Sequence, residues 1–425
     1  MTDREAHGGV DVHGPVFISY RQSDGTPTSA SVARRLRAAG VPVWRDKTDL
    51  PPGDTTARLQ EAIDAGISGA VIVITDHVIE SQVMREVEVP RLLELHRSDP
   101  RFALQIVNKV RAGGKVDYAA PDRLLQLAPG TLKGVDQQPA TTKGLQGAAR
   151  ALVELRVARH RDVGAHDLFA VSVQSRNEGR ASDVSNATLD VRLEASLDGR
   201  LPSRVGLEDL RWVCSLLPTL FVESRQSVVS ISGGSHLSPA FAIGAALPST
   251  RAGRMLICQG SHGAVWDSAS AVTGASSAFG LLEEARDGAT GPAATASAVY
   301  VDVVAGEASD FAFDQFWAQH SAEIREALVL RSEQRIQISA EQGPALAAEI
   351  MARIRALWGR CGNGEVHLFL RVPFPLAVLL GRLSNTLSVT VYEWTAADGA
   401  RYVPALRVES GAQPSAVREI VLPIG

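Results

Sequence analysis

Three stretches within the first ninety residues decide the fold: PVFISYRQSDG at 15–25, VPVWRDKTDLPPGD at 41–54 and AVIVITDHVIESQVMREVEV at 70–89. Each contains a short apolar run typical of a buried strand, and each then changes to polar or helical sequence. Strands that alternate with helices at this spacing predict a parallel α/β sheet. Open α/β sheets bind ligands beyond the carboxyl ends of their strands, which is where these polar residues fall.

The first domain is expected to span 14–158 as a flavodoxin-like sheet. Its predicted strands and helices alternate in the order 15–20, 29–39, 41–44, a helix marked by Leu59, Ile63 and Ile67, 70–75, 81–94 and 102–107. Residues 111–145 are rich in Gly, Pro and Thr and break the periodic pattern. Helix 144–158 is expected to close the domain, and the charged run 159–162 is interpreted as a linker.

An aromatic–Ile–Ser–Tyr–Arg start, a strand ending in Asp46 and a helix bearing Glu86 follow one another in this domain. In this order they resemble the TIR (Toll/interleukin-1 receptor) domain. The resemblance implies either a scaffold role or cleavage of NAD+ at the nicotinamide–ribose bond. It also implies that Glu86 is the catalytic carboxylate, which would stabilise an oxocarbenium-like ribose while nicotinamide leaves as a neutral molecule. Glu88 is a rival, but two residues along a helix it points to nearly the opposite side.

The same resemblance implies further NAD-binding residues, namely Phe17, Tyr20, Arg21 and Asp46. Arg21 would contact the pyrophosphate, and Asp46 would stand beside the loop 47–54. Plainer interpretations exist: Phe17 as a core residue, Asp46 as a cap of the loop. An exposed helix carboxylate is the plain interpretation of Glu86.

The sequence also departs from the family pattern, with Gln82 where many NAD-cleaving members carry Trp and Thr75 where Ser is usual. Pro90 adds a local prediction. A proline inside a helix clashes with the carbonyl four residues back, here that of Glu86. The helix is therefore expected to bend or restart beside Glu86.

The rest of the chain contains an internal repeat. In the first copy, helix 207–220 precedes SVVSISGGSHLSPAFAIGAALPST (227–250) and RMLICQ (254–259); in the second, helix 344–358 precedes EVHLFLRVPFPLAVLLGRLSN (365–385) and SVTVYEW (388–394). A leading strand stands before each copy, HDLFAVSV (166–173) and SAVYVDVV (297–304), and 268–297 is expected to be the loop between the copies. Two Rossmann-like halves, about 163–267 and 298–425, would form a pseudo-dimer.

This arrangement, with SISGGSHLSPAFAIGAAL and HLFLRVPFPLAVLLG, resembles the SAVED domain over roughly 163–425. The resemblance implies a fused pair of CARF-like halves that senses a cyclic oligonucleotide. Independently, a glycine-rich loop entering a helix presents backbone N–H groups and the positive end of the helix dipole to an anion. The candidate messenger-binding residues are Ser235, His236, Ser238, Arg371, Pro373, Phe374 and Trp394. His236 could instead be a capping neighbour and Trp394 a packing residue.

Together the two domains resemble an effector of CBASS-type antiviral defence in bacteria. The resemblance implies an NAD+ hydrolase with no cofactor, activated by a cyclic tri- or other oligoadenylate that drives homo-oligomers or filaments. A non-catalytic TIR adaptor and a metabolite-regulated nucleotide hydrolase remain alternatives. The messenger's ring size, base and linkage, the product (linear or cyclic ADP-ribose) and the resting oligomeric state stay open.

Composition sets wider limits. The 425 residues are 45% hydrophobic and 21% charged, which is typical of two or three globular domains, and the net charge is −4. Neither a basic stripe for DNA, nor a metal-ligand cluster such as HExxH, nor an apolar run of about 18–20 residues is present. Cys214, Cys258 and Cys361 stand far apart, as expected of reduced structural cysteines. The polar N-terminus lacks an apolar signal segment. We therefore expect a cytoplasmic protein.

Overall fold

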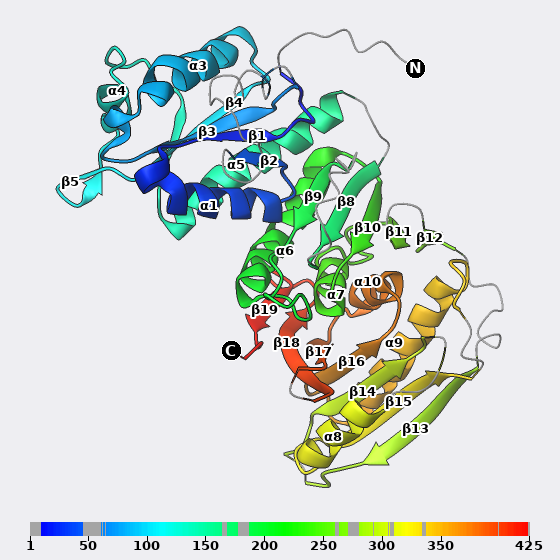
Figure 1. Cartoon of the computed structure of the whole chain (residues 1–425). Coiled ribbons are helices and arrows are strands. Elements are labelled where there is room, and N and C mark those ends of the chain that lie inside the picture. Colours follow the sequence, from blue (N-terminus) through cyan, green and yellow to red (C-terminus); the bar gives the residue numbers. More distant parts are fainter. Residues whose placement is uncertain are drawn as a thin grey trace. The chain divides into compact units, whose positions relative to one another are not determined.

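Figure 1 shows the computed structural model, which describes residues 10–45, 61, 63, 65–163, 168–176, 187–259, 263–270, 280–291, 293–304, 306, 310–333, 337–397 and 399–423. Contacts divide the chain into two units, Met1–His166 with Ser185–Val191, and Asp167–Val184 with Arg192–Gly425. Within the described ranges, no helix has the length and apolarity needed to cross a membrane. The same ranges contain no cluster of three or more His, Cys, Asp or Glu side chains fit to hold a metal ion.

The first unit is built on a five-stranded sheet in the order β2-β1-β3-β4-β7, and every neighbouring pair is parallel. This is the 2-1-3-4-5 order of a flavodoxin-like fold, so the predicted fold class is confirmed. Strands β1, β3 and β4 are buried along their whole length, because helices cover both faces. Helix α3 lies on one side of the sheet, and α1 and α5 lie on the other (Figure 1). The elements of this unit are β1 Val16–Ser19, α1 Gln22–Ala38, β2 Val43–Arg45, β3 Gly69–Ile74, a 3-10 turn Val78–Glu80, a π-helical turn Met84–Glu88, α3 Val89–Ser98, β4 Ala103–Asn108, β5 Arg111–Ala112, β6 Lys115–Val116, α4 Ala120–Leu124, β7 Asp136–Pro139 and α5 Thr142–Asp162.

Three predictions for this unit were wrong in detail. Helix α1 begins at Gln22, seven residues before the expected start, because Gly25 and Pro27 make its first turns look like a loop. The irregular stretch contains β7, an edge strand whose partly exposed residues lack an apolar pattern. The expected linker at 159–162 is the last turn of α5, in which His160 is buried. The helix expected around 59–67 lies largely outside the described residues.

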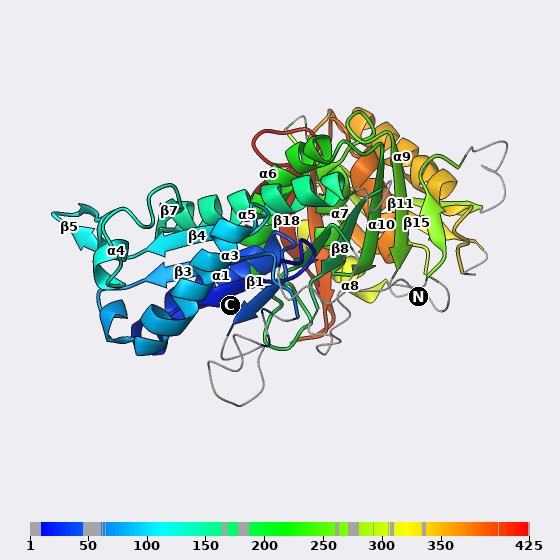
Figure 2. The ribbon, with the colours of Figure 1, turned by 90° about the horizontal axis from the view of Figure 1, so that it is seen from above.

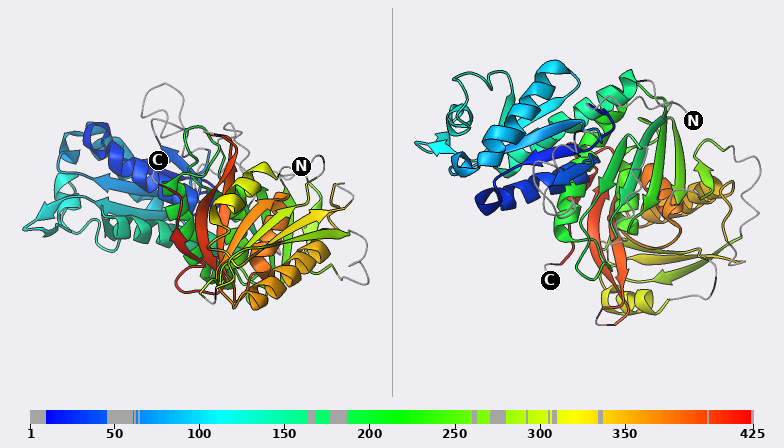
Figure 3. Two further views of the ribbon diagram at one scale, coloured as in Figure 1. Left: turned by 90° about the horizontal axis from the view of Figure 1, so that it is seen from below. Right: turned by 45° about the horizontal axis from the view of Figure 1, so that its top comes forward.

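The second unit contains the predicted repeat. Strand β10 lies between β8 and β11, and β16 lies between β14 and β17, with all four pairings parallel. The sheets have the orders β12-β11-β10-β8-β9 and β13-β15-β14-β16-β17-β18-β19, and Figure 3 gives two further views of the second, from yellow-green β13 to red β19. Part of the expected inter-copy loop is strand β13, antiparallel to β15. The elements of these two sheets and of the helices between them are β8 Leu168–Gln174, β9 Leu189–Arg192 (of which residues 189–191 fall in the first unit), α6 Arg204–Ser224, β10 Val228–Gly234, α7 Leu237–Ala246, β11 Arg254–Gln259, β12 Val265–Asp267, β13 Leu281–Asp287, β14 Ser297–Asp302, α8 Phe311–His320, β15 Glu326–Ser332, α9 Gly343–Arg360, β16 Val366–Arg371, α10 Phe374–Leu383, β17 Ser388–Thr395, β18 Arg401–Glu409 and β19 Val417–Ile420.

Helices α7 and α10 lie side by side within this unit (Figure 1 and Figure 2). They start 137 positions apart, and they touch backbone to backbone at one glycine from each copy. A Cβ on Gly244 would lie 2.0 Å from the carbonyl oxygen of Val378, and a Cβ on Gly381 would lie 1.9 Å from that of Phe241. Both glycines and both carbonyls are again 137 positions apart. The contact is therefore two-fold symmetric, as a duplicated half predicts.

The end of α7 is also held by the other half. The buried guanidinium of Arg382, on α10, donates hydrogen bonds to the carbonyl oxygens of Leu247 and Gly253, both at 3.0 Å, and to that of Ala252. Burial lowers the pKa of Arg382. A cation at the C-terminus of a helix complements the helix dipole and satisfies carbonyls that have no partner inside the helix. The second half thus stabilises the C-terminal end of α7.

The crossing glycines provide a test of this packing. Gly244→Ala or Gly381→Ala forces a methyl group into a backbone contact, so we expect the free energy of unfolding to fall by about 1–3 kcal/mol or more. Gly359→Ala is the matched control, since Gly359 is also helical but its added Cβ meets open space. Alanine at that position should leave stability unchanged or raise it by up to about 1 kcal/mol. Denaturant unfolding measures the free energy of unfolding of the three variants. Equal values for all three would contradict a close backbone contact between α7 and α10.

Candidate functional site

The predicted catalytic carboxylate, Glu86, lies in the π-helical turn that precedes α3. The turn is closed by a hydrogen bond from the Val89 N–H to the Met84 carbonyl, and Pro90 stands at the start of α3. The backbone stays helical through the turn, with Val83 and Val89 in the αR region, and only its hydrogen-bond spacing widens beside Glu86. The bend or restart expected from Pro90 remains a prediction. Glu86 is exposed, and the Gln82 side-chain amide donates a hydrogen bond of 2.8 Å to its Oε2 atom.

Glu88 points the other way. It is buried, and its Oε2 atom accepts a hydrogen bond of 2.6 Å from the hydroxyl of Ser19 at the carboxyl end of β1. The opposite orientation of the two glutamates matches the expectation for residues two apart on a helix. Of the two, Glu86 has the carboxylate that a substrate can reach.

The other residues predicted to bind NAD have varied environments. Phe17 is 3% exposed and belongs to the core of the first unit, and Tyr20 is also buried. Arg21 pairs with Asp24 at 3.2 Å and with Glu80 at 2.5 Å. Its guanidinium is therefore engaged at this edge of the sheet. Asp46 lies outside the described residues. The roles of these residues remain predictions.

In the second unit, His236 is the N-cap residue of α7 and is 2% exposed. Its backbone N–H donates to the Ser175 hydroxyl at 2.8 Å, and the same hydroxyl hydrogen-bonds its Nδ1 atom at 2.8 Å. Burial, reinforced by the positive charge of Arg176, lowers the pKa of His236 to about 4. The ring is therefore neutral near pH 7. Ser175 directly follows β8, the leading strand of the first copy, and no pattern in the sequence identified it.

The N-terminus of α7 already holds an acid from the other half. Glu393, on β17, accepts a hydrogen bond of 2.6 Å from the Ser238 N–H and is 6% exposed. Burial raises the pKa of Glu393, and hydrogen bonds from Ser238 offset part of that rise. The next residue of α7, Pro239, has no N–H to offer. The Ser238 N–H, expected from the sequence to be free for a ligand, is therefore used inside the protein.

The equivalent place in the second half has different chemistry. Pro373 is the N-cap residue of α10, and Phe374 behind it is buried. Arg371 donates to both carboxylate oxygens of fully buried Asp302 at 3.0 Å. By strand register, Val229 pairs with Met255 and Val366 with Val389, so Gln259 is the counterpart of Glu393. At this position the second half thus has the carboxylic acid Glu393, and the first half has the exposed amide Gln259.

Trp394 is 48% exposed and follows Glu393 on β17. Successive side chains of a strand point to opposite faces, so Trp394 shares its face with Tyr392 and not with Glu393. Tyr392 packs with Phe316 of α8 in an aromatic cluster. Trp394 therefore lies on the face of β17 opposite to Glu393, the residue that contacts the N-terminus of α7. The messenger-binding roles of the seven candidate residues remain predictions.

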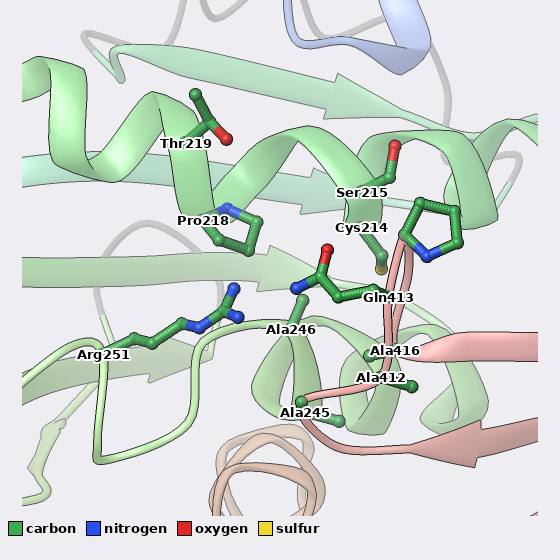
Figure 4. Close-up of a pocket in the computed structure, with 12 residues that line it drawn as sticks. Cys214, Ser215, Pro218, Thr219, Ala245, Ala246, Arg251, Ala412, Gln413 and Ala416 are labelled. Carbon is green, nitrogen blue, oxygen red and sulfur yellow. The ribbon is translucent and has the colours of Figure 1, made fainter.

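A pocket of about 100 Å³ lies between α6, the C-terminal end of α7 and the turn before β19 (Figure 4). The guanidinium of Arg251 and the amide of Gln413 point toward one another across it, with the thiol of Cys214 nearby. Burial raises the pKa of that thiol. The cavity is at the opposite end of α7 from His236, and none of the candidate messenger residues lines it.

Buried His236 predicts a pH dependence of stability. The unfolded chain has an imidazole pKa near 6.5 and the folded chain one of about 4, so the unfolded state binds more protons between these values. The neutral, buried imidazole therefore contributes up to about 3 kcal/mol to the free energy of unfolding. The whole contribution is present above pH 6.5, and it is lost as the pH falls toward 4. His236→Asn should flatten that slope in denaturant unfolding, whereas exposed His77→Asn should keep it. Parallel slopes for His236→Asn and wild type would refute the argument.

The link between Glu393 and α7 can be tested in the same assay. Glu393→Ala leaves the Ser238 N–H buried without its acceptor, so the free energy of unfolding should fall by about 1–3 kcal/mol. Glu393→Gln retains an acceptor and should recover most of the loss. Glu419→Ala, which removes an exposed ion pair with Arg407, should change stability by less than about 1 kcal/mol. If Glu393→Ala lowered the free energy of unfolding no more than Glu419→Ala does, the contact of Glu393 with the N-terminus of α7 would contribute little to stability.

Comparisons with known proteins identify both units. Residues 16–124 match the family model of the TIR domain, and residues 218–408 match that of the SMODS-associated and fused to various effectors sensor domain, SAVED. A curated relative, the NAD(+) hydrolase PdTIR of Paracoccus denitrificans (strain Pd 1222), is 32% identical over 98 residues. The match spans 22% of this chain and only 31% of that relative's length.

Two solved structures cover most of the chain. The Cap4 SAVED/CARF-domain containing receptor of Acinetobacter baumannii with the cyclic trinucleotide 2'3'3'-cAAA is 12% identical, with a TM-score of 0.44 over 89% of this chain and 96% of that chain. The Cap4 receptor of Moraxella osloensis is 13% identical, with a TM-score of 0.39 over 89% and 97%. The TIR model matches within the first unit and the SAVED model within the second. The chain is therefore a fusion of an N-terminal TIR domain with a C-terminal SAVED domain.

Proposed function

We propose that this protein is an NAD+ hydrolase whose TIR domain is switched on when the SAVED domain binds a cyclic oligonucleotide. One observation carries the proposal: a TIR domain related to a known NAD(+) hydrolase and a domain of a sensor family occupy one chain. A sensor fused to an enzyme is useful only if ligand binding changes the activity. NAD+ depletion in CBASS-type antiviral defence is the output we propose.

Glu86 is the proposed catalytic residue. Nicotinamide leaves NAD+ as a neutral molecule, so the reaction needs little acid catalysis and depends on stabilising a cationic, oxocarbenium-like ribose. The exposed carboxylate of Glu86, which accepts a hydrogen bond from the Gln82 amide, can supply that charge. Glu88 is a poorer candidate because Ser19 and the protein interior already engage it.

A cyclic oligoadenylate is the activator we propose, and cyclic trinucleotides such as those in the A. baumannii Cap4 structures are suitable probes. Activation would proceed through assembly of several subunits, for which we expect from the sequence that residues 47–54, which lie outside the described residues, complete the cleft of a neighbouring subunit. Contacts between two different faces give an open-ended filament. The messenger can drive assembly only to the extent that it binds the assembled state more tightly.

The proposal is tested by nicotinamide release from NAD+ with the purified full chain and a panel of cyclic di-, tri- and tetranucleotides. We expect turnover with one messenger and a fall of about a hundredfold or more in Glu86→Gln. Glu94→Gln, an exposed glutamate of α3 paired with Arg91, is the matched control and should keep activity. Sedimentation of the same samples reports assembly.

The outcomes separate the alternatives. Tight binding of one messenger without turnover would favour the non-catalytic adaptor. Turnover that persists in Glu86→Gln would remove Glu86 from the mechanism. A fully active species that stays monomeric would remove assembly, and activation by a mononucleotide alone would favour the metabolite-regulated hydrolase.

A further inference from the structure

The TIR domain contains a buried hydrogen bond between residues 69 positions apart. The hydroxyl of Ser19, at the carboxyl end of β1, donates to Oε2 of Glu88 at 2.6 Å. Ser19 is 1% exposed and Glu88 is 6% exposed. Taking a carboxylate out of water is costly unless hydrogen bonds compensate, so this contact strongly favours one position of Glu88.

Glu88 is the last residue of the π-helical turn that also carries Glu86. Met84, the first residue of the turn, is 1% exposed and points into the core beside it. Residues two positions apart on a helix face nearly opposite directions. With Glu88 held inward, Glu86 is turned outward, where its carboxylate is exposed.

The backbone alone does not fix this rotation. The turn contains a wide hydrogen bond from the Val89 N–H to the Met84 carbonyl, and Pro90 has no N–H to return to the carbonyl of Glu86. Single π turns inside helices are rare and occur often at functional sites. Because Pro90 cannot donate a backbone hydrogen bond here, a side-chain contact can help to keep the register of the turn, and Ser19 provides one from the end of β1.

We propose that Ser19 and Glu88 are positioning residues that hold the π turn in register and thereby direct Glu86 toward the substrate. This inference rests on the proposed NAD+ hydrolase function. The outer contact, Gln82 to Glu86, is exposed and competes with water, so it restrains Glu86 less than the buried contact does. Ser19 and Glu88 need not touch NAD+.

Two readouts on the full chain test the proposal. In the activated enzyme, Ser19→Ala should lower kcat by about tenfold to a hundredfold and leave KM nearly unchanged, because the carboxylate is misdirected and the rest of the cleft is intact. Glu88→Gln still offers an acceptor to Ser19 and should retain most of the activity. Hydrogen–deuterium exchange without ligand should be faster at residues 84–90 in Ser19→Ala.

Ser29→Ala is the matched control. Ser29 is also fully buried in the same domain, and its hydroxyl donates to the Thr26 carbonyl within α1, so its loss tests a general effect of removing a buried hydroxyl. It should alter neither kcat nor exchange at 84–90. Wild-type kcat and exchange in Ser19→Ala would overturn the proposal, as would an equal effect of Ser29→Ala.

The two proposals fail differently. If the wild-type chain releases no nicotinamide with any cyclic nucleotide, the proposed function fails, and the exchange measurement still decides whether Ser19 holds the turn. If the wild type is active and Ser19→Ala keeps its kcat despite faster exchange, Ser19 stabilises the turn without directing Glu86, and the positioning role is refuted.

Discussion

Direct backbone contact between α7 and α10 is the constraint on which the SAVED domain depends. Helices approach this closely only where a residue has no side chain, and here Gly244 and Gly381 provide the space. Both helices are buried on all sides, so each needs the surrounding protein to cover its apolar side chains. The second half then holds α7 at both ends, with Glu393 at its N-terminus and Arg382 at its C-terminus. The two halves therefore fold as one body around a helix pair.

The fold followed from the sequence where burial was complete. Strands with fully apolar runs, such as 70–75, revealed the parallel sheet, and the repeat emerged because both copies keep the same order of helix and buried strand. Edge strand β7 escaped prediction because it is half-exposed and carries no apolar period. Residues 159–162 were predicted to be a linker because they are charged, but a charged run can also be the end of a long helix, as it is in α5.

The sites were less predictable than the fold. A motif can mark Glu86 and helix geometry can separate it from Glu88, but no local pattern reveals that Ser19 receives Glu88. The same limit applies to the SAVED domain, where Glu393 and Asp302 are partners far away in sequence. Local sequence predicts that the N–H groups at a helix N-terminus are free, and this prediction fails when a side chain distant in sequence already accepts their hydrogen bonds.

Duplication has left the SAVED domain with two halves that share a backbone plan and differ in chemistry. His236 caps one helix and Pro373 the other, while an acid in one half corresponds to the amide of Gln259 in the other. A molecule lying across both halves would meet different groups at its two ends. Turned end for end, it would not recover the same contacts, so the two orientations differ in energy. The two ends of the duplicated domain are therefore chemically distinct, although its backbone is nearly two-fold symmetric.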